Sequence, residues 1–186
     1  TREQIERVHE AAYVDEVFES APEEGLVWLD GDTAMNPHSL EAALHAAGAN
    51  VQAVDMLMAG EARRAFCAVR PPGHHAGPDR AMGFCIFNNV AVGVAHALAA
   101  GIQRVAVVDF DVHHGNGTQA IFWNTDNVGY LSTHEADAYP GTGRLSLTSH
   151  APGRIINIPV PAFSGKQVFE PILDEIILPW LTKFNP

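Results

Sequence analysis

Two carboxylates and two imidazoles follow one apolar segment of the chain. In the stretch VAVVDFDVHHGNGTQ, residues 105–119, these are Asp109, Asp111, His113 and His114. Asp111 and His113 are two residues apart, so on an extended segment both side chains point to the same side and could bind one metal ion. Asp109 points the same way from a deeper position, which suits an acceptor that orients a histidine ring. The alternative is an ordinary solvated strand end, but so much charge after an apolar run favours a metal site.

A second pair of imidazoles, His74 and His75, lies in the proline- and glycine-rich loop of residues 70–83. Neighbouring residues cannot easily face one metal ion, whereas two rings with different partners could hold different protonation states. The pair therefore indicates acid and base roles near neutral pH. A histidine pair alone is more often structural, so this interpretation depends on its convergence with the first cluster.

The elements that position these residues follow from the hydrophobic periodicity. Helices are predicted over residues 1–20, 37–60, 88–100, 117–123 and 166–178, and strands over 65–69, 104–110, 127–133 and 154–160. Apolar strands that alternate with helices predict an α/β fold with a parallel sheet covered by helices. Ligands bind at the carboxyl ends of such strands, so we expect the loops after the first three strands to converge on one site.

The composition is typical of one globular domain, with 186 residues of which 47% are hydrophobic. A net charge of −11 argues against direct nucleic acid binding, and suits a cationic partner or simply keeps the protein in solution. Cys67 and Cys85 lack the spacing of a metal or redox motif, so we expect free thiols. No segment resembles a membrane helix or a signal peptide, so we expect a cytoplasmic protein without membrane contact.

Four stretches resemble successive signature blocks of the histone deacetylase superfamily, which includes bacterial histone deacetylase-like amidohydrolases and acetylpolyamine amidohydrolases. In chain order they are RPPGHHAGPDRAMGFCIFNNVAVGVAHAL, VAVVDFDVHHGNGTQAIF, LSTHEADAYPGTG and NIPV. The resemblance implies the arginase–deacetylase fold, a parallel sheet between helical layers. It also implies an amidohydrolase that uses a divalent metal, usually Zn²⁺, to remove acyl groups from an acetylated lysine peptide or an acetylated polyamine.

The resemblance further implies roles for individual residues. Asp111 and His113 correspond to metal ligands, and His75 to the histidine usually assigned as general base and then acid. His74 corresponds to the electrostatic neighbour of His75 and is paired to Asp109. Asn116 corresponds to the hydrogen-bond partner of His75, where other branches of the family have an aspartate.

Other family positions line the substrate channel or bind a second cation. The channel lining corresponds to Gly83, Phe84 and Tyr139, although from the sequence alone both aromatic residues could belong to the core. A K⁺ or Na⁺ site corresponds to the backbone of Asp109, Asp111, His113, Ser132 and Thr133. His114 and His134 match family positions without a clear chemical role, and we interpret both as packing or hydrogen-bonding residues.

Two parts of the family pattern do not occur in these 186 residues, namely an aspartate in a GFD context, the third metal ligand, and a tyrosine in a GGY context. We therefore expect residues 1–186 to be a single deacetylase-type domain truncated before the third metal-ligand segment. Catalytic zinc normally has three protein ligands, so the segment alone should be nearly inactive.

Two other functions stay open from the sequence. One is a non-catalytic remnant or binding module of the same fold. The other is an arginase-like ureohydrolase, which ranks lower because Gly115 stands where that branch expects a further aspartate. The metal could also be iron or cobalt by ligand type, and the resemblance leaves a homo-oligomer open.

Overall fold

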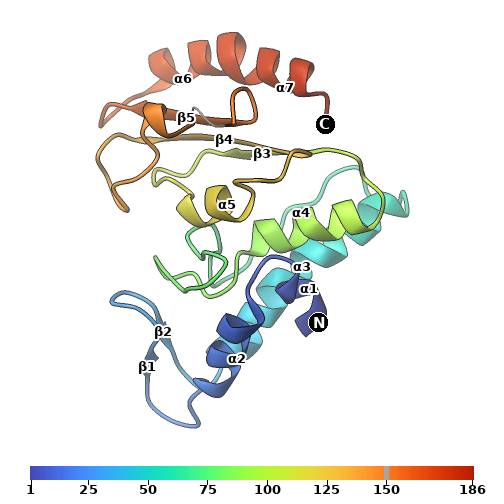
Figure 1. The fold of residues 1–186 in the computed structure, drawn as a ribbon, viewed down its shortest axis with the longest axis vertical. Coiled ribbons are helices and arrows are strands. Elements are labelled where there is room, and N and C mark those ends of the chain that lie inside the picture. The colour runs from blue at the N-terminus through green and yellow to red at the C-terminus, as the bar shows by residue number, and fades with distance from the viewer. Residues whose placement is uncertain (149–150) are drawn as a thin grey trace. The chain divides into compact units, whose positions relative to one another are not determined.

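The computed structural model describes residues 1–148 and 151–186, and the chain forms two compact units (Figure 1). The N-terminal unit is Thr1–Gly101 and the C-terminal unit is Ile102–Pro186. The prediction that the chain forms a single domain stays a prediction.

The N-terminal unit is mainly helical. Its elements are α1 (Arg2–Glu6), α2 (Ala11–Glu19), the antiparallel strands β1 (Val27–Trp28) and β2 (Ala34–Met35), α3 (Ser39–Met58) and α4 (Asn89–Ala99). Helix α4 starts where the sequence predicts, because the Asn88 side chain accepts a hydrogen bond from the Ala91 amide. Helices α3 and α4 pack against each other, and both have buried alanine and valine side chains.

The predicted single helix over residues 1–20 is wrong in one respect, because it is interrupted between α1 and α2. Glu10 has an extended backbone, and its amide donates to the carbonyl oxygen of Pro78 at 2.7 Å instead of continuing a helix. This bond ties the start of α2 to the loop that carries His74 and His75.

The predicted strand over residues 65–69 is also wrong. These residues form no strand in the structure, and the Phe66 side chain is 92% exposed. A strand needs a neighbour for its backbone hydrogen bonds, and in the described part of the chain none pairs with this segment.

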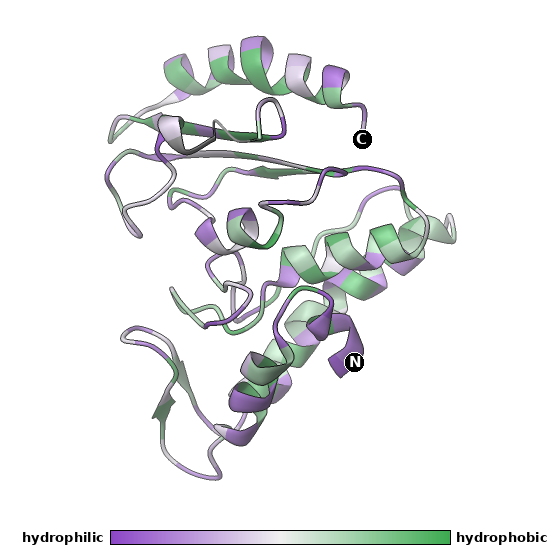
Figure 2. Cartoon of the chain, viewed as in Figure 1, coloured by the Kyte–Doolittle hydropathy of each residue, from purple (hydrophilic) through white to green (hydrophobic). Residues whose placement is uncertain are grey.

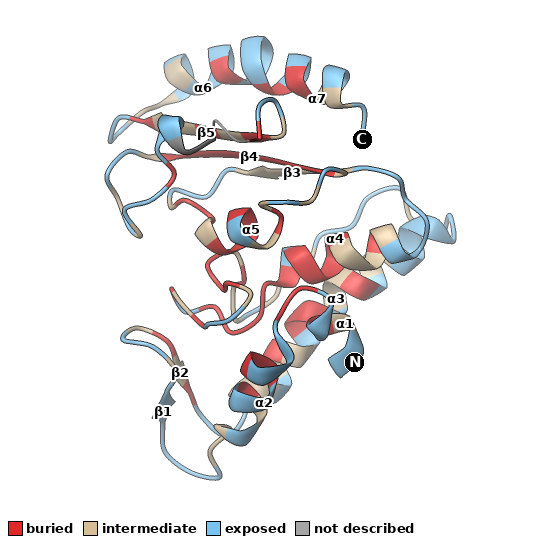
Figure 3. Ribbon diagram, viewed as in Figure 1, coloured by how far each residue is buried: buried red, intermediate tan, exposed pale blue. Residues whose placement is uncertain are grey.

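The C-terminal unit contains a three-stranded parallel sheet in the order β3-β4-β5. Its elements are β3 (Val105–Asp109), α5 (Asn116–Ile121), β4 (Val128–Glu135), the 3₁₀ turn η1 (Leu145–Thr148), β5 (Ile155–Val160), α6 (Lys166–Ile172), the π-helical turn η2 (Leu173–Ile177) and α7 (Leu178–Phe184). The central strand, β4, is buried along almost its whole length (Figure 3). The parallel sheet predicted from the sequence is therefore present here.

Helical segments cover both faces of this sheet. On one face, Leu131 and Val160 pack with Ile172, Ile177 and Trp180 from the α6–η2–α7 segment, whose apolar residues are green in Figure 2. On the other face, next to α5, a smaller cluster contains Tyr130, Ala151 and Ile155, with Trp123 packed against it. The long helical segment contains a π-helical turn just after Pro171, which has no amide hydrogen to continue a regular α-helix.

Both cysteines are free, with Cys85 buried and Cys67 half-buried, as expected for thiols without a disulfide. In residues 1–148 and 151–186, no helix is both long enough and apolar enough to cross a lipid bilayer.

Candidate active site

The two predicted metal ligands lie side by side just after β3. The amide of His113 donates to Asp111 Oδ1 at 2.8 Å, which folds the segment into a tight turn. The same oxygen lies 3.3 Å from His113 Nδ1, and the Asp111 and His113 side chains are 50% and 43% exposed. Two donor atoms of the type that zinc prefers are therefore adjacent and accessible.

Asp109 fixes the start of this turn from a less exposed position. Its Oδ1 accepts from the Asp111 amide at 3.2 Å, and its Oδ2 accepts from the hydroxyl of Tyr130 at 3.2 Å. Burial and the charge of Asp109 raise the pKa of Tyr130 well above its ordinary value, so this hydroxyl remains a donor. Asp109 thus acts on the backbone that carries the ligand pair.

The carboxyl ends of β3 and β4 bring the other predicted residues of this unit together. Asp109, the last residue of β3, pairs in register with Ser132 on β4. Ser132 and Thr133 therefore lie beside the start of the turn that carries Asp111 and His113. Asn116 is the first residue of α5. The predicted cation site at these backbones stays a prediction, as do the pairings of Asn116 with His75 and of Asp109 with His74, which would join residues of different units.

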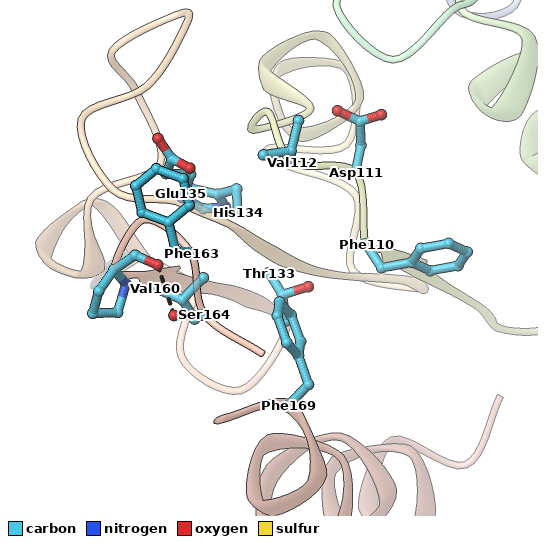
Figure 4. A pocket seen from close by; sticks show the side chains of 11 residues that line it. Phe110, Asp111, Val112, Thr133, His134, Glu135, Val160, Phe163, Ser164 and Phe169 are labelled. Carbon is cyan, nitrogen blue, oxygen red and sulfur yellow. Dashed lines mark hydrogen bonds between the residues drawn. The ribbon is translucent and has the colours of Figure 1, made fainter. Parts of the chain in front are cut away.

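A pocket of about 310 Å³ borders this sheet end in the C-terminal unit. Figure 4 shows Asp111 and Val112 on one side of it and Thr133 and Phe169 on another. The Thr133 hydroxyl is buried and has no hydrogen-bond partner among residues 1–148 and 151–186. Within the same residues, no cluster of three or more His, Cys, Asp or Glu side chains is arranged to hold a metal ion.

In the N-terminal unit, His74 and His75 form a contacting pair of rings, with centroids 4.0 Å apart. His75 is only 4% exposed. Its ring packs on the backbone of Gly83, where an added Cβ would lie 2.4 Å from His75 Cδ2. Gly83 also has a φ of +57°, so both the close approach and the backbone conformation require glycine.

The turn at Gly83 and Phe84 is held by two residues that the sequence analysis missed. Asp32 Oδ1 accepts from the Gly83 amide at 2.9 Å, and Thr33 Oγ1 accepts from the Phe84 amide at 3.1 Å. Phe84 has a φ of +64°, which is uncommon for a residue with a side chain. No periodicity in the sequence could reveal these bonds, because they join residues 51 apart.

A buried histidine, also missed from the sequence, supports the His74–His75 loop. The Asn88 amide donates to His9 Nε2 at 2.9 Å, and the Asn88 side chain donates to the Ala76 carbonyl at 3.1 Å. Burial lowers the pKa of His9 to about 4, so this ring is neutral near pH 7 and can accept the hydrogen bond.

The two predicted aromatic channel residues are accessible. Phe84 is 63% exposed and Tyr139 is 40% exposed, which excludes the alternative that both belong to the core. The Tyr139 ring stands edge-on to the His113 ring, with centroids 5.9 Å apart. Within the C-terminal unit, a predicted channel residue and a predicted metal ligand are therefore neighbours.

Comparisons with known proteins agree with this arrangement. The model of the histone deacetylase domain matches residues 1–186. The histone deacetylase-like amidohydrolase of Pseudomonas aeruginosa is 41% identical over 188 residues, which cover 99% of this chain and 49% of that protein. The chain spans about half the length of the curated relatives that it matches.

Two solved structures resemble the chain over its whole length. The crystal structure of the HDA15 HD domain gives a TM-score of 0.95 at 36% identity, and the chain covers 56% of it. The acetylpolyamine aminohydrolase from Burkholderia pseudomallei gives 0.88 at 30% identity, with 64% of that chain covered. The predicted arginase–deacetylase fold is confirmed, and the chain belongs to the histone deacetylase family.

Proposed function

We propose that this chain supplies the acid–base residues and two metal ligands of a zinc-dependent amidohydrolase that removes acetyl or other acyl groups from lysine side chains or polyamines. The observation that carries the proposal is the Asp111–His113 pair. Its donor atoms are 3.3 Å apart. Two donors bound to one tetrahedral zinc ion at about 2.0–2.1 Å would be separated by about 3.3 Å. The pair therefore fits a zinc ion, and the half-exposed side chains leave room for further ligands.

Asp111 and His113 would hold the ion, which when bound would polarise the amide carbonyl and make water easier to deprotonate. His75 would take the proton of the attacking water and later donate a proton to the leaving amine. Imidazole suits this exchange because its ordinary pKa lies close to neutral pH, and the His75 ring is held by burial and by contact with the His74 ring. His74 would adjust the proton affinity of His75 through their contact.

Phe84 and Tyr139 would line the channel for the acyl-bearing side chain. A lysine or polyamine stem is a narrow apolar chain, and aromatic side chains bind such a stem while excluding water. Gly83 would let the stem pass close to the backbone. The K⁺ or Na⁺ ion would lie at the backbone of Asp109, Asp111, His113, Ser132 and Thr133, where carbonyl oxygens are the usual ligands of such ions.

The charge of the chain supports a basic substrate. With 22 acidic and 11 basic residues, it attracts polyamines and lysine-rich peptides and repels nucleic acids. A similar structure is named an acetylpolyamine aminohydrolase. Both acetylated lysine peptides and acetylated polyamines therefore stay candidate substrates, and a cytoplasmic location and a homo-oligomer stay predictions.

The test is a deacetylation assay on the 186-residue chain and on the product of the full reading frame that encodes it. Each is given an acetyl-lysine peptide and an N-acetylated polyamine, before and after removal and return of zinc. We expect zinc-dependent release of acetate from the full product and nearly none from the 186 residues alone. Zinc binding without turnover in either sample would instead support a binding module, and strong activity without zinc would contradict the proposal.

A further inference from the structure

His114 and His134 are buried in the C-terminal unit, and the chemistry proposed above uses neither. We propose that they are positioning residues, which hold the Thr142–Gly143 end of the loop of residues 136–143 through the hydrogen bonds of their Nε2–H tautomers and thereby fix Tyr139 beside His113. The inference rests on the proposed function only in taking Tyr139 as a channel residue. Its structural content can be tested without substrate or metal.

The hydrogen bonds of His134 define its tautomer. Nε2 lies 3.0 Å from the carbonyl oxygen of Gly143, which can only accept, so Nε2 carries the hydrogen. Nδ1 then accepts from the hydroxyl of Ser132, 2.9 Å away. His134 therefore connects strand β4 to the loop through one donated bond, and Ser132 fixes the plane of the ring.

His114 has the same tautomer for an independent reason. Its Nε2 lies 3.0 Å from Gln119 Oε1, and the same oxygen accepts from the Asn157 side chain at 2.8 Å, so it faces two donors. Nδ1 of His114 then accepts from the hydroxyl of Thr142 at 2.8 Å. The ring thus connects the loop to α5 and, through Asn157, to β5.

The two rings also contact each other and enclose one glycine. Their centroids are 4.8 Å apart. A Cβ added to Gly143 would lie 2.4 Å from His134 Nε2 and 2.6 Å from the Cγ of His114. The backbone at Gly143 therefore lies directly against both imidazoles, and no larger residue fits between them.

The other end of the loop is tied to the sheet, so Tyr139 lies between two anchored ends. The Ala136 amide donates to the carbonyl of Val160 at 2.8 Å, and the Gly141 amide closes a turn on Ala138 at 2.8 Å. Tyr139 lies within that turn, and its ring meets His113 edge-on. Displacement of the Thr142–Gly143 end should therefore move the Tyr139 ring relative to His113.

The first test compares two glycines of the same loop. Gly141 and Gly143 have nearly equal φ values of +77° and +79°, but a Cβ on Gly141 would meet nothing within 4 Å. Gly141→Ala and Gly143→Ala therefore share the backbone strain, and only Gly143→Ala disturbs the two rings. In protein labelled with 3-fluorotyrosine, we expect Gly143→Ala to shift the ¹⁹F resonance of Tyr139, and Gly141→Ala to leave it close to that of the wild type. Equal shifts in the two variants would overturn the inference.

The second test reads the tautomers in the wild-type protein, and variants serve only to assign the signals. Long-range ¹H–¹⁵N spectra of the wild-type imidazoles distinguish the two tautomers. The signals of His114 and His134 are assigned by their loss in His114→Gln and His134→Gln. We expect the Nε2–H pattern for both rings at pH 7, with slow exchange of the Nε2 proton because both rings are buried. An Nδ1–H pattern, or a charged ring, would contradict the proposal.

A kinetic test then connects the loop to the proposed function. In the full reading-frame product, misplacement of a channel wall by about 1 Å can cost up to about a hundredfold in rate. We expect kcat/KM to fall about tenfold to a hundredfold in Gly143→Ala and less than about threefold in Gly141→Ala. His134→Gln, which keeps an N–H donor, should retain more activity than His134→Leu. If neither substrate is turned over, the proposed function fails while the spectra still decide the positioning role.

Discussion

The loop around His75 and the Asp111–His113 pair are held in different ways. His75 is almost fully buried against Gly83, and hydrogen bonds hold the backbone of Gly83 and of Ala76, the residue after His75. Asp111 and His113 are about half exposed, and they contact each other. The proposed proton-transfer group is thus held in place before any substrate binds, which would avoid reorganisation during reaction. An exposed pair gains little from its own contact, so its geometry should depend on the metal ion.

The largest expected effect comes from removal of the prepared imidazole. His75→Gln keeps a polar side chain of similar length but cannot exchange a proton near pH 7. General acid–base catalysis typically contributes a factor of 10² to 10⁴, so we expect kcat of the full reading-frame product to fall by about a thousandfold. Zinc content, measured by mass spectrometry, should not change. A variant that loses zinc together with activity would show that the two regions are not independent.

Acid should destabilise the folded chain through protonation of His9. Its pKa is about 4 in the folded chain and near 6.5 when unfolded, so between these values only the unfolded chain takes up the proton. Stability is therefore lost as the pH falls from about 6.5 towards 4, and by pH 4.5 this one group should cost about 2–3 kcal/mol. Urea unfolding at pH 7.5 and 4.5 measures the loss.

His9→Gln is the matched control for this pH dependence, because its side-chain oxygen can still accept from the Asn88 amide. The variant should lose about 2–3 kcal/mol less than the wild type between the two pH values. His114, which also has a pKa of about 4, contributes equally to both proteins and cancels in the comparison. An identical loss in the wild type and the variant would show that His9 does not carry the effect.

The zinc affinity of the exposed Asp111–His113 pair should depend on the negative charge of Asp111. Asp111→Asn keeps an oxygen that can accept from the His113 amide but removes the negative charge that binds a cation. Loss of groups that only orient ligands costs tenfold to a hundredfold in metal affinity, so we expect loss of a ligand charge to cost about a hundredfold or more. Competition with a zinc-binding dye measures the affinity, and the fold of the apoprotein should be unchanged by circular dichroism.

Two apolar segments show which parts of the fold could be predicted from the sequence. Residues 65–69 and 105–109 look alike as patterns, yet only the second forms a strand, because β4 lies beside it. The hydrophobic pattern shows which side chains a segment could bury. Whether the segment becomes a strand depends on hydrogen bonds to a neighbouring strand from another part of the chain. The start of α4 was predictable because Asn88 caps it locally. The break before α2 was not, because the Glu10 amide bonds to Pro78.

The contacts of the candidate site likewise include some that the sequence could predict and others that it could not. That Asp111 and His113 lie together could be predicted, because their two-residue spacing already places them side by side. The contacts of His9, Asp32 and Thr33 could not, since each joins a side chain to a backbone amide more than 50 residues away. The residues proposed to do chemistry leave a local pattern in the sequence, whereas those that hold them in place leave none here.

The smallest expected effect tests one of these hidden supports. Thr33→Val keeps the shape of a buried side chain but removes the hydroxyl that accepts from the Phe84 amide and donates to Asp32. Leaving a partly buried amide without its partner should cost about 1 kcal/mol in the free energy of unfolding. Thr33→Ser, which keeps the hydroxyl, should retain the bond. Hydrogen exchange of the Phe84 amide checks this directly, because it should accelerate about fivefold in Thr33→Val for a loss of about 1 kcal/mol. If the amide exchanges at the same rate in both variants, then Gly83 and Phe84 keep their conformation through the Asp32 bond and the His75 contact, and the Thr33 bond does not hold this turn.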